Sequence, residues 1–256
     1  KIRKADRNLK PGSYIFGGNT YLWQTVSRLY KGQNESITIT FPEGLSLYKT
    51  LKKIDASGLA TYEELHKAAT NPFLVKKLTG FDALSLEGFL YPETYRFPIE
   101  ISPDSILAIP AGEFFRRLQK EGIDPFAVPD FYDKLILASI VEKEAGDESE
   151  KEIIAGLFLN RMRQQMALQS CPTIDYILEP KGIKRSVLTY ADTQINSPYN
   201  TYLYQGLPPT PICNPSITTI KAVLNAKPNS YLYFFSDRQG KNVFSKTYEE
   251  HLAKQR

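Results

Sequence analysis

The stretch LILASIVEKEAGDESEKEIIAGLFLNRMR, residues 135–163, consists of two apolar runs separated by a polar break rich in acids. Both runs repeat apolar residues at spacings of three and four, which is the period of an amphipathic helix. We therefore predict two helices between Phe131 and about Met166. The unusual feature is the tripeptide Glu-Lys-Glu, which ends the first run where the pattern asks for another apolar residue.

Glu144 is the second acid of this tripeptide, and it extends a core-facing stripe at helical spacing made up of Leu137, Ile140 and Val141. On that face, partial burial and the negative end of the helix dipole would both raise the pKa of the carboxyl. The like charges of Asp147, Glu148 and Glu150 are expected to add to the increase. A carboxyl that stays protonated near neutral pH can act as a general acid. The alternative is that Glu144 begins a solvated acidic turn, and the pattern alone leaves both interpretations open.

The composition is that of an ordinary globular protein, with 42% hydrophobic and 23% charged residues in a chain of 256. This length is sufficient for two domains. The net charge of +4 is too mild to indicate nucleic-acid binding. No uninterrupted apolar stretch approaches the roughly 18 residues of a membrane span. With two histidines, His66 and His251, and no CxxC motif, neither a metal site nor a cofactor is expected.

The two cysteines, Cys171 and Cys213, lie 213 − 171 = 42 positions apart. They are either idle thiols or the partners of a disulfide, and the spacing does not decide between the two.

Helices and strands are both expected, so the fold class is α+β. Up to about residue 40 we expect a strand, a helix and a strand; a mostly helical span follows, with Ser46 and Thr61 as N-caps. LEGFLYPETYRFP is expected to be strand or loop, and Pro110 to interrupt the helix after it. The chain is predicted to end with a helix, a strand, the turn DRQGK, a strand and a helix.

Residues 169–215 form a long region rich in Pro, Asn, Tyr and Thr, and a loop-rich region of this length in a compact chain is usually functional. Its segment YNTY contains Tyr199, Asn200 and Tyr202. The aromatic rings could pack on sugar faces while amides bind the hydroxyls. The alternative is a proline-stiffened connector packed by its own tyrosines. A structural interpretation also competes with a functional one for Asn160 and Arg161, which could be a helix-surface pair or form an ion pair with Glu150.

Several segments in register resemble one known family: LKPGSYIF, FPEG, LEGFLYPETYRF, ASIVEKEAG, IAGLFLNRMR, LQSCPTIDY, SPYNTYLYQGLPPTPICNPS and YLYFFSD. From about Leu9 to His251 the chain is similar to the endolytic murein transglycosylases, the YceG-like family. The resemblance implies an enzyme that cuts within peptidoglycan glycan strands. It also implies a LysM-like glycan-binding module at about residues 1–40, then a catalytic domain at 41–256 with a helical insert at about 44–80.

The resemblance implies that Glu144 is the catalytic acid. It would protonate the glycosidic oxygen between N-acetylmuramic acid and N-acetylglucosamine, then accept the proton of the C6 hydroxyl as a 1,6-anhydro ring closes. Since water is not the nucleophile, no second carboxylate is needed. Other residues are expected to line or support the cleft: Glu87, Glu150, Asn160, Arg161, Gln169, Tyr199, Asn200 and Tyr202. Glu150 is expected to face the same cleft as an orienting group.

In one position the chain departs from the family pattern, because Cys171 stands where relatives tend to have Asp before Pro-Thr. We interpret that position as structural.

Two further interpretations stay open. One is a non-catalytic peptidoglycan-binding scaffold for cell-wall synthases, and the other is a muramidase-type hydrolase with Glu150 or Glu87 as base. The resemblance also implies penicillin-binding synthases as partners. It implies a single-pass anchor in the cell membrane, through an N-terminal helix outside this sequence, with the catalytic domain outside the cytoplasm.

Overall fold

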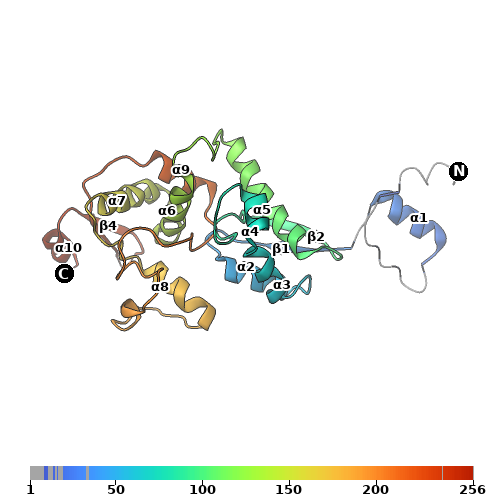
Figure 1. Ribbon diagram of the computed structural model, residues 1–256, viewed down its shortest axis with the longest axis horizontal. Coiled ribbons are helices and arrows are strands. Elements are labelled where there is room, and N and C mark those ends of the chain that lie inside the picture. The colour runs from blue at the N-terminus through green and yellow to red at the C-terminus, as the bar shows by residue number, and fades with distance from the viewer. Residues whose placement is uncertain are drawn as a thin grey trace.

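The computed structural model describes residues 9–10, 14, 16, 20–32, 35–237 and 239–255. Within these residues, helices predominate and the strands form two separate two-stranded sheets (Figure 1), which confirms the α+β class. The helices are α1 Leu22–Lys31, α2 Leu47–Asp55, α3 Tyr62–Ala69, α4 Pro72–Thr79, α5 Pro103–Lys120, α6 Phe131–Glu144, α7 Lys151–Arg163, α8 Cys171–Leu178, α9 Ile217–Asn225 and α10 Tyr248–Lys254. The strands are β1 Ser36–Thr40, β2 Thr94–Pro98, β3 Tyr233–Ser236 and β4 Asn242–Ser245. Short 3₁₀ turns are η2 Glu148–Glu150, η3 Glu179–Lys181 and η4 Asp192–Gln194.

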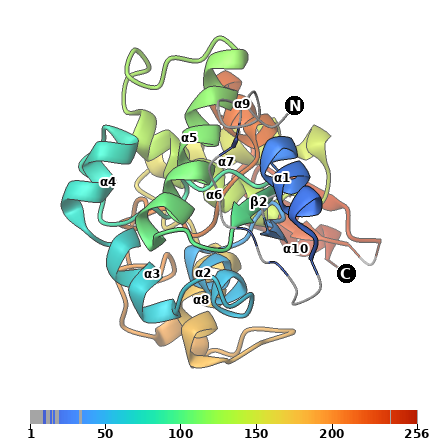
Figure 2. The same cartoon turned by 90° about the vertical axis from the view of Figure 1, so that its right-hand side faces the viewer.

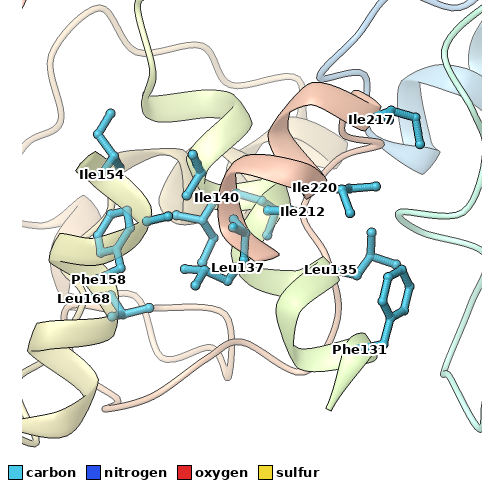
Figure 3. Packing of buried hydrophobic residues seen from close by; sticks show 14 of the residues in the cluster. Phe131, Leu135, Leu137, Ile140, Ile154, Phe158, Leu168, Ile212, Ile217 and Ile220 are labelled. Atoms are coloured by element: carbon cyan, nitrogen blue, oxygen red, sulfur yellow. The ribbon is translucent and has the colours of Figure 1, made fainter. Parts of the chain in front are cut away.

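The predicted helix pair is present as α6 and α7, and with α9 it encloses one hydrophobic core (Figure 3). Helix α6 is buried around almost its whole circumference, since every residue from 135 to 141 is buried. Each fully buried Leu, Ile or Phe contributes about 1.5–3 kcal/mol relative to an exposed one. This packing fixes α6 in the centre of the domain, and it thereby fixes the position of its last residue, Glu144.

A second hydrophobic core lies between helices α2 to α5 and the sheet β1–β2. The predicted N-caps are confirmed, since Ser46 accepts from Lys49 N at 3.2 Å and Thr61 from Glu64 N at 3.3 Å. Strand β1 pairs antiparallel with β2, with Ile37 opposite Phe97. One strand of the predicted N-terminal module is thus joined to a strand that lies well beyond it in the sequence. The expected first strand, PGSYIF, falls mostly outside the described residues, and the module boundary at residue 40 stays a prediction.

Two sequence-based expectations about helices are wrong. Helix α5 runs through Pro110 without interruption. Proline removes one helical hydrogen bond, but buried side chains before and after it, such as Leu107 and Ala111, hold the helix in the second core. In the loop-rich region, residues 171–178 form helix α8, whose Pro172 lies in the first turn, where a missing N–H costs nothing.

The C-terminal part follows the expected order. Helix α9 leads to the antiparallel hairpin β3–β4, in which Phe234 is opposite Phe244, and α10 follows. In the predicted turn, Gly240 N donates to Asp237 O at 3.0 Å. Among the described residues, no helix combines the length and the apolar character needed to cross a bilayer.

Candidate active site

A cavity of about 410 Å³ opens at the C-terminal end of α6, with Glu144 in its wall. The remaining wall comes from α7, from the segment around the start of α8, and from the hairpin β3–β4 with α10. The described lining residues besides Glu144 are Arg161, Leu168, Gln169, Cys171, Tyr202, Tyr233, Phe234, Phe235, Ser236, Tyr248 and His251. Segments more than 100 positions apart in the chain therefore enclose a single carboxyl.

The carboxyl of Glu144 is sheltered from water, and this burial raises its pKa to about 7. The hydroxyl of Ser170 donates a hydrogen bond of 2.6 Å to Oε1 and lowers the pKa, while the charge of Asp175 raises it and that of Arg161 lowers it. The expectation of a raised pKa caused by burial is confirmed. Glu144 can hold a proton near neutral pH and still ionise readily, which a group that both donates and accepts a proton requires.

Asp147, Glu148 and Glu150 were expected to raise the pKa of Glu144 further, but they are not the acids that do so. The like charge that acts on Glu144 is Asp175 of α8. The acids of the turn are engaged locally: Asp147 accepts from Ser149 N at 2.6 Å, and Glu148 pairs with Lys151 at 2.5 Å. The prediction was wrong because it assumed that neighbours in sequence are the nearest charges.

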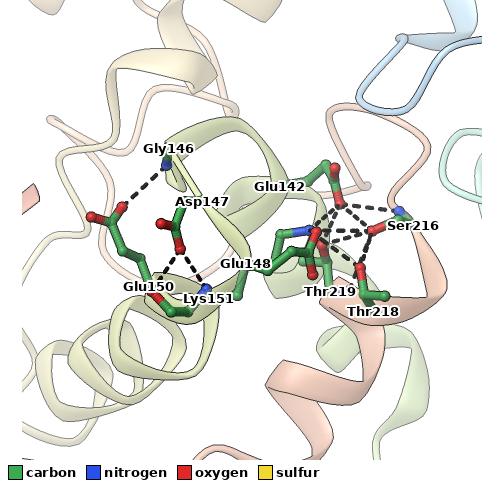
Figure 4. Close-up of polar contacts among 10 residues, drawn as sticks. Glu142, Gly146, Asp147, Glu148, Glu150, Lys151, Ser216, Thr218 and Thr219 are labelled. Atoms are coloured by element: carbon green, nitrogen blue, oxygen red, sulfur yellow. Dashed lines mark hydrogen bonds and ion pairs between the residues drawn. The ribbon is translucent and has the colours of Figure 1, made fainter. Parts of the chain in front are cut away.

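Glu150 is buried and orients the end of α6. It is not among the described residues that line the cavity. Its carboxylate accepts from Gly146 N at 3.2 Å, from Asn242 N at 2.9 Å and from Asn242 Nδ2 at 2.8 Å (Figure 4 shows the Gly146 contact). The same Asn242 amide donates to the backbone carbonyl of Glu144 at 3.2 Å. The expectation that Glu150 faces the cleft is therefore wrong. The prediction that Glu150 supports the site as an orienting group fits these contacts.

Glu142, the first acid of Glu-Lys-Glu, has a structural position. It accepts from Ser216 N, at the N-cap of α9, at 3.0 Å and from the hydroxyl of Thr219, in the first turn of α9 (Figure 4). The buried ammonium of Lys151 lies 3.8 Å from Glu142 and 2.5 Å from Glu148. This network joins α6, α7 and α9 just before Glu144, so the two acids of one tripeptide have separate tasks.

Arg161 and Asn160 are both buried, so the helix-surface interpretation is wrong, and neither contacts Glu150. Arg161 donates to Leu232 O and to Leu168 O, each at 2.7 Å, and its guanidinium lies over the Tyr233 ring at 5.4 Å. Asn160 donates to Asn229 O at 2.6 Å. Arg161 thus borders the cavity and fixes two of its walls, while Asn160 supports the hairpin from behind.

The segment YNTY is divided between lining and support. Tyr202 lines the cavity, with its hydroxyl 3.0 Å from Cys171 Sγ. Asn200 is fully buried, donates to Thr193 O and Ile195 O, and accepts from Tyr202 N at 2.9 Å.

Tyr199 lies outside the described lining, where it contacts Thr210 at 2.9 Å and the Tyr176 ring. Gln169, at a positive φ of 52°, lines the cavity and donates its N–H to Thr201 O at 2.9 Å.

Glu87 lies away from this cavity. Its buried carboxylate accepts from Leu47 N at 2.8 Å, at the start of α2, and from the Tyr176 hydroxyl at 3.1 Å. Burial raises its pKa to about 8. The structure therefore places Glu87 as a support for α2.

Both cysteines are free thiols: Cys171 is exposed beside Glu144, and Cys213 is buried. In the part of the chain that the structure describes, no group of three His, Cys, Asp or Glu side chains could hold a metal ion.

Sequence reasoning missed several residues of the site. Ser170 was hidden in a segment expected to be loop. Tyr233, Tyr248 and His251 come from the C-terminal hairpin and helix, which no local pattern connects to Glu144. The available signals were two motifs of the family resemblance, LQSCPTIDY, which includes Ser170, and YLYFFSD, which includes Tyr233.

A model of the YceG-like family matches residues 1–256, the whole chain. The chain belongs to the YceG-like family. It is 36% identical over 169 residues to an endolytic murein transglycosylase of Bacillus subtilis, a match that covers 65% of this chain and 46% of the relative. It is 27% identical over 278 residues to an endolytic murein transglycosylase of Streptococcus pneumoniae, covering 95% of this chain and 50% of the relative.

A crystal structure of a yceG-like protein from Listeria monocytogenes superposes on this YceG-like chain with a TM-score of 0.75 and 30% identity, over 98% of this chain and 87% of that one. The chain spans about half the length of the curated relatives that it matches.

Proposed function

We propose that this protein is an endolytic lytic transglycosylase that cleaves the bond between N-acetylmuramic acid and N-acetylglucosamine within peptidoglycan strands. The name of the Bacillus and Streptococcus relatives, endolytic murein transglycosylase, supports this substrate and reaction. The observation that carries the proposal is the single carboxyl of the cavity: of the described lining residues, Glu144 alone is an Asp or Glu.

One sheltered carboxyl suits an intramolecular reaction. Protonated Glu144 donates its proton to the glycosidic oxygen, and that C1–O bond breaks to leave an oxocarbenium-like centre at C1 of the muramic acid. The ionised carboxylate then accepts the proton of the C6 hydroxyl, whose oxygen bonds to C1 and closes the 1,6-anhydro ring. The proton returns to Glu144, so the enzyme regains its starting state. Attack by a hydroxyl of the same sugar also gains from proximity.

A hydrolase would need a second carboxylate about 5–9.5 Å from the first, either as nucleophile or to activate water. The two acids considered for that part, Glu150 and Glu87, are both buried and held by backbone N–H groups outside the cavity lining. This arrangement argues against Glu150 or Glu87 as the second carboxylate of the muramidase-type alternative.

The aromatic walls of the cavity suit a sugar polymer. Tyr202, Tyr233 and Tyr248 offer rings and hydroxyls, and Gln169 offers an amide, in the combination that carbohydrate sites use. The Arg161 guanidinium lies over the Tyr233 ring and helps to hold that ring in place.

The test is digestion of purified sacculi followed by mass analysis of the products. Anhydro ends are expected, and the variant Glu144→Gln should release at least about 100-fold less, the lower range for loss of a general acid. Reducing ends would instead show a hydrolase, and an inactive wild-type protein that still binds sacculi would show a scaffold.

We also propose that the catalytic part works outside the cytoplasm, anchored in the cell membrane by a helix N-terminal to these residues, and that penicillin-binding synthases are its partners. The support is chemical, because the proposed substrate lies outside the membrane and those synthases polymerise the same strands. Fractionation of cells and cross-linking of the full-length protein would test both statements.

A further inference from the structure

A second cavity, of about 410 Å³, lies beside the first. Its walls come from the start of α2, the last turn of α6, helix α8 and residues 182–185. Figure 2 shows α8 next to α2. Lys143 and Pro172 line this cavity, and each directly neighbours a residue of the first cavity, Glu144 and Cys171. The two cavities are therefore separated by little more than the start of α8.

The charges of this second cavity are only partly paired. Lys49 forms an ion pair with Glu179, and Arg185 Nε lies 3.1 Å from Asp192 Oδ2. Within the described part of the chain, Lys143, Lys184 and the carboxyl of Asp175 form no ion pair. The wall thus presents two unpaired cations and one unpaired acid, which complements a ligand with two carboxylates and one ammonium group.

The walls are held in place before any ligand arrives. Asp192 accepts from Thr189 N at 2.9 Å as well as from Arg185, and this fixes the segment that carries Lys184. On the opposite side, the Tyr176 hydroxyl donates to Glu87 at 3.1 Å. A preorganised site loses less entropy on binding than a mobile one.

The lining differs from that of a sugar site. No Asn or Gln is present among the described residues of this cavity. Charged groups and two tyrosines, Tyr48 and Tyr176, are mixed with the apolar side chains Pro172, Ile183 and Ile212. This mixture suits the backbone and side chains of a peptide better than a series of sugar hydroxyls.

We propose that this second cavity binds the short acidic peptide that the glycan strand carries, so that the enzyme selects peptide-bearing strands over bare ones. The inference rests on the proposed function. The peptide is attached at C3 of the muramic acid whose C1 lies at Glu144, so it leaves the first cavity within one sugar ring. Helix α8 is about 12 Å long, at 1.5 Å per residue, and about four extended peptide residues, at about 3.4 Å each, span it.

The test compares kcat/KM on peptide-bearing strands and on strands stripped of peptide by an amidase. Wild-type protein should prefer the peptide-bearing strands. Lys184→Glu should lower kcat/KM on these by about fivefold, the size of one partly exposed ion pair, and leave the bare strands unaffected. Ile183→Trp, which fills the cavity, should act in the same direction. Lys181→Glu is the matched control, since Lys181 is exposed, lies three residues earlier in the sequence and is not among the described lining residues.

Equal wild-type kcat/KM on both strands, or an equal loss with Lys184→Glu on both, would overturn the peptide site while the proposed function stands. If wild-type protein cleaves neither strand, the proposed function fails, and an NMR titration with the free peptide decides separately. Shifts at the Ile183 and Ile212 methyl groups that disappear in Lys184→Glu would support the site. Absence of such shifts at millimolar peptide would overturn it.

Discussion

Replacement of Glu144 by glutamine should increase the free energy of unfolding at alkaline pH and leave it nearly unchanged in acid. Glutamine keeps the shape and an oxygen that can accept the hydrogen bond from Ser170, which is 2.6 Å long in the wild type. It removes the one feature that the mechanism needs, a proton that can be donated and accepted. The variant therefore separates ionisation of the carboxyl from its packing.

The size of the effect follows from the pKa of Glu144, which is about 7 in the folded protein against an ordinary 4.5. Between these values the folded state binds more protons than the unfolded state, so stability falls as the pH rises. The difference, 7 − 4.5 = 2.5, corresponds to about 3.4 kcal/mol at about 1.36 kcal/mol per pKa unit. Although the carboxyl itself is sheltered, residue Glu144 as a whole is only half-buried at the edge of an open cavity, so we discount this value to about 2–3 kcal/mol.

The assay is urea unfolding of wild type and variant from about pH 4.5 to pH 8.5. The gain in stability of Glu144→Gln should develop with a slope that levels off above about pH 7. Glu148→Gln is the control with the opposite sign, because the hydrogen bond from Lys151 lowers the pKa of Glu148 below its ordinary 4.5. Its loss should weaken the protein by an amount that is almost complete just above pH 4.5 and then stays nearly constant to pH 8.5. If the difference between wild type and Glu144→Gln is the same at every pH, the carboxyl ionises normally and the argument for a proton donor is refuted.

Three further predictions concern the surroundings of the acid. Ser170→Ala removes a hydrogen bond that lowers the pKa of Glu144, so the alkaline limb of the pH–rate profile should move up by about one pH unit; an unmoved limb would contradict the assigned contact. Glu150→Gln turns an amide N–H₂ toward donors such as Asn242, so it should lower the free energy of unfolding by about 1–3 kcal/mol in urea titrations, and an unchanged midpoint would argue against this support. Relative to the wild type, Glu87→Gln should gain free energy of unfolding as the pH rises toward about 8, the pKa of Glu87. It should retain cleavage of sacculi, because Glu87 does not line the described cavity. Loss of cleavage in a folded variant would return Glu87 to the site.

Local patterns were sufficient for much of the secondary structure. Helical spacing predicted α6 and α7, capping residues predicted the starts of α2 and α3, and the turn DRQGK predicted the hairpin β3–β4. These signals are contacts between residues a few positions apart, which a sequence displays directly. The patterns failed at α5, where Pro110 was expected to interrupt the helix although packing makes it tolerable. They failed again at α8, where a composition rich in Pro, Asn, Tyr and Thr indicated a loop although Pro172 lies in the first turn of a helix.

The sequence by itself determined which carboxyl to consider, because helical spacing and the resemblance to the YceG-like family both selected Glu144; its catalytic role stays a prediction. Only the tertiary structure decided the surroundings of that carboxyl. Asp175 rather than the adjacent acids acts on its charge, Ser170 binds it, and the C-terminal hairpin and α10 complete its cavity. A pKa and a cavity depend on which atoms lie within a few ångströms, and these atoms belong to segments far apart in the chain, so no pattern of neighbouring residues could specify them.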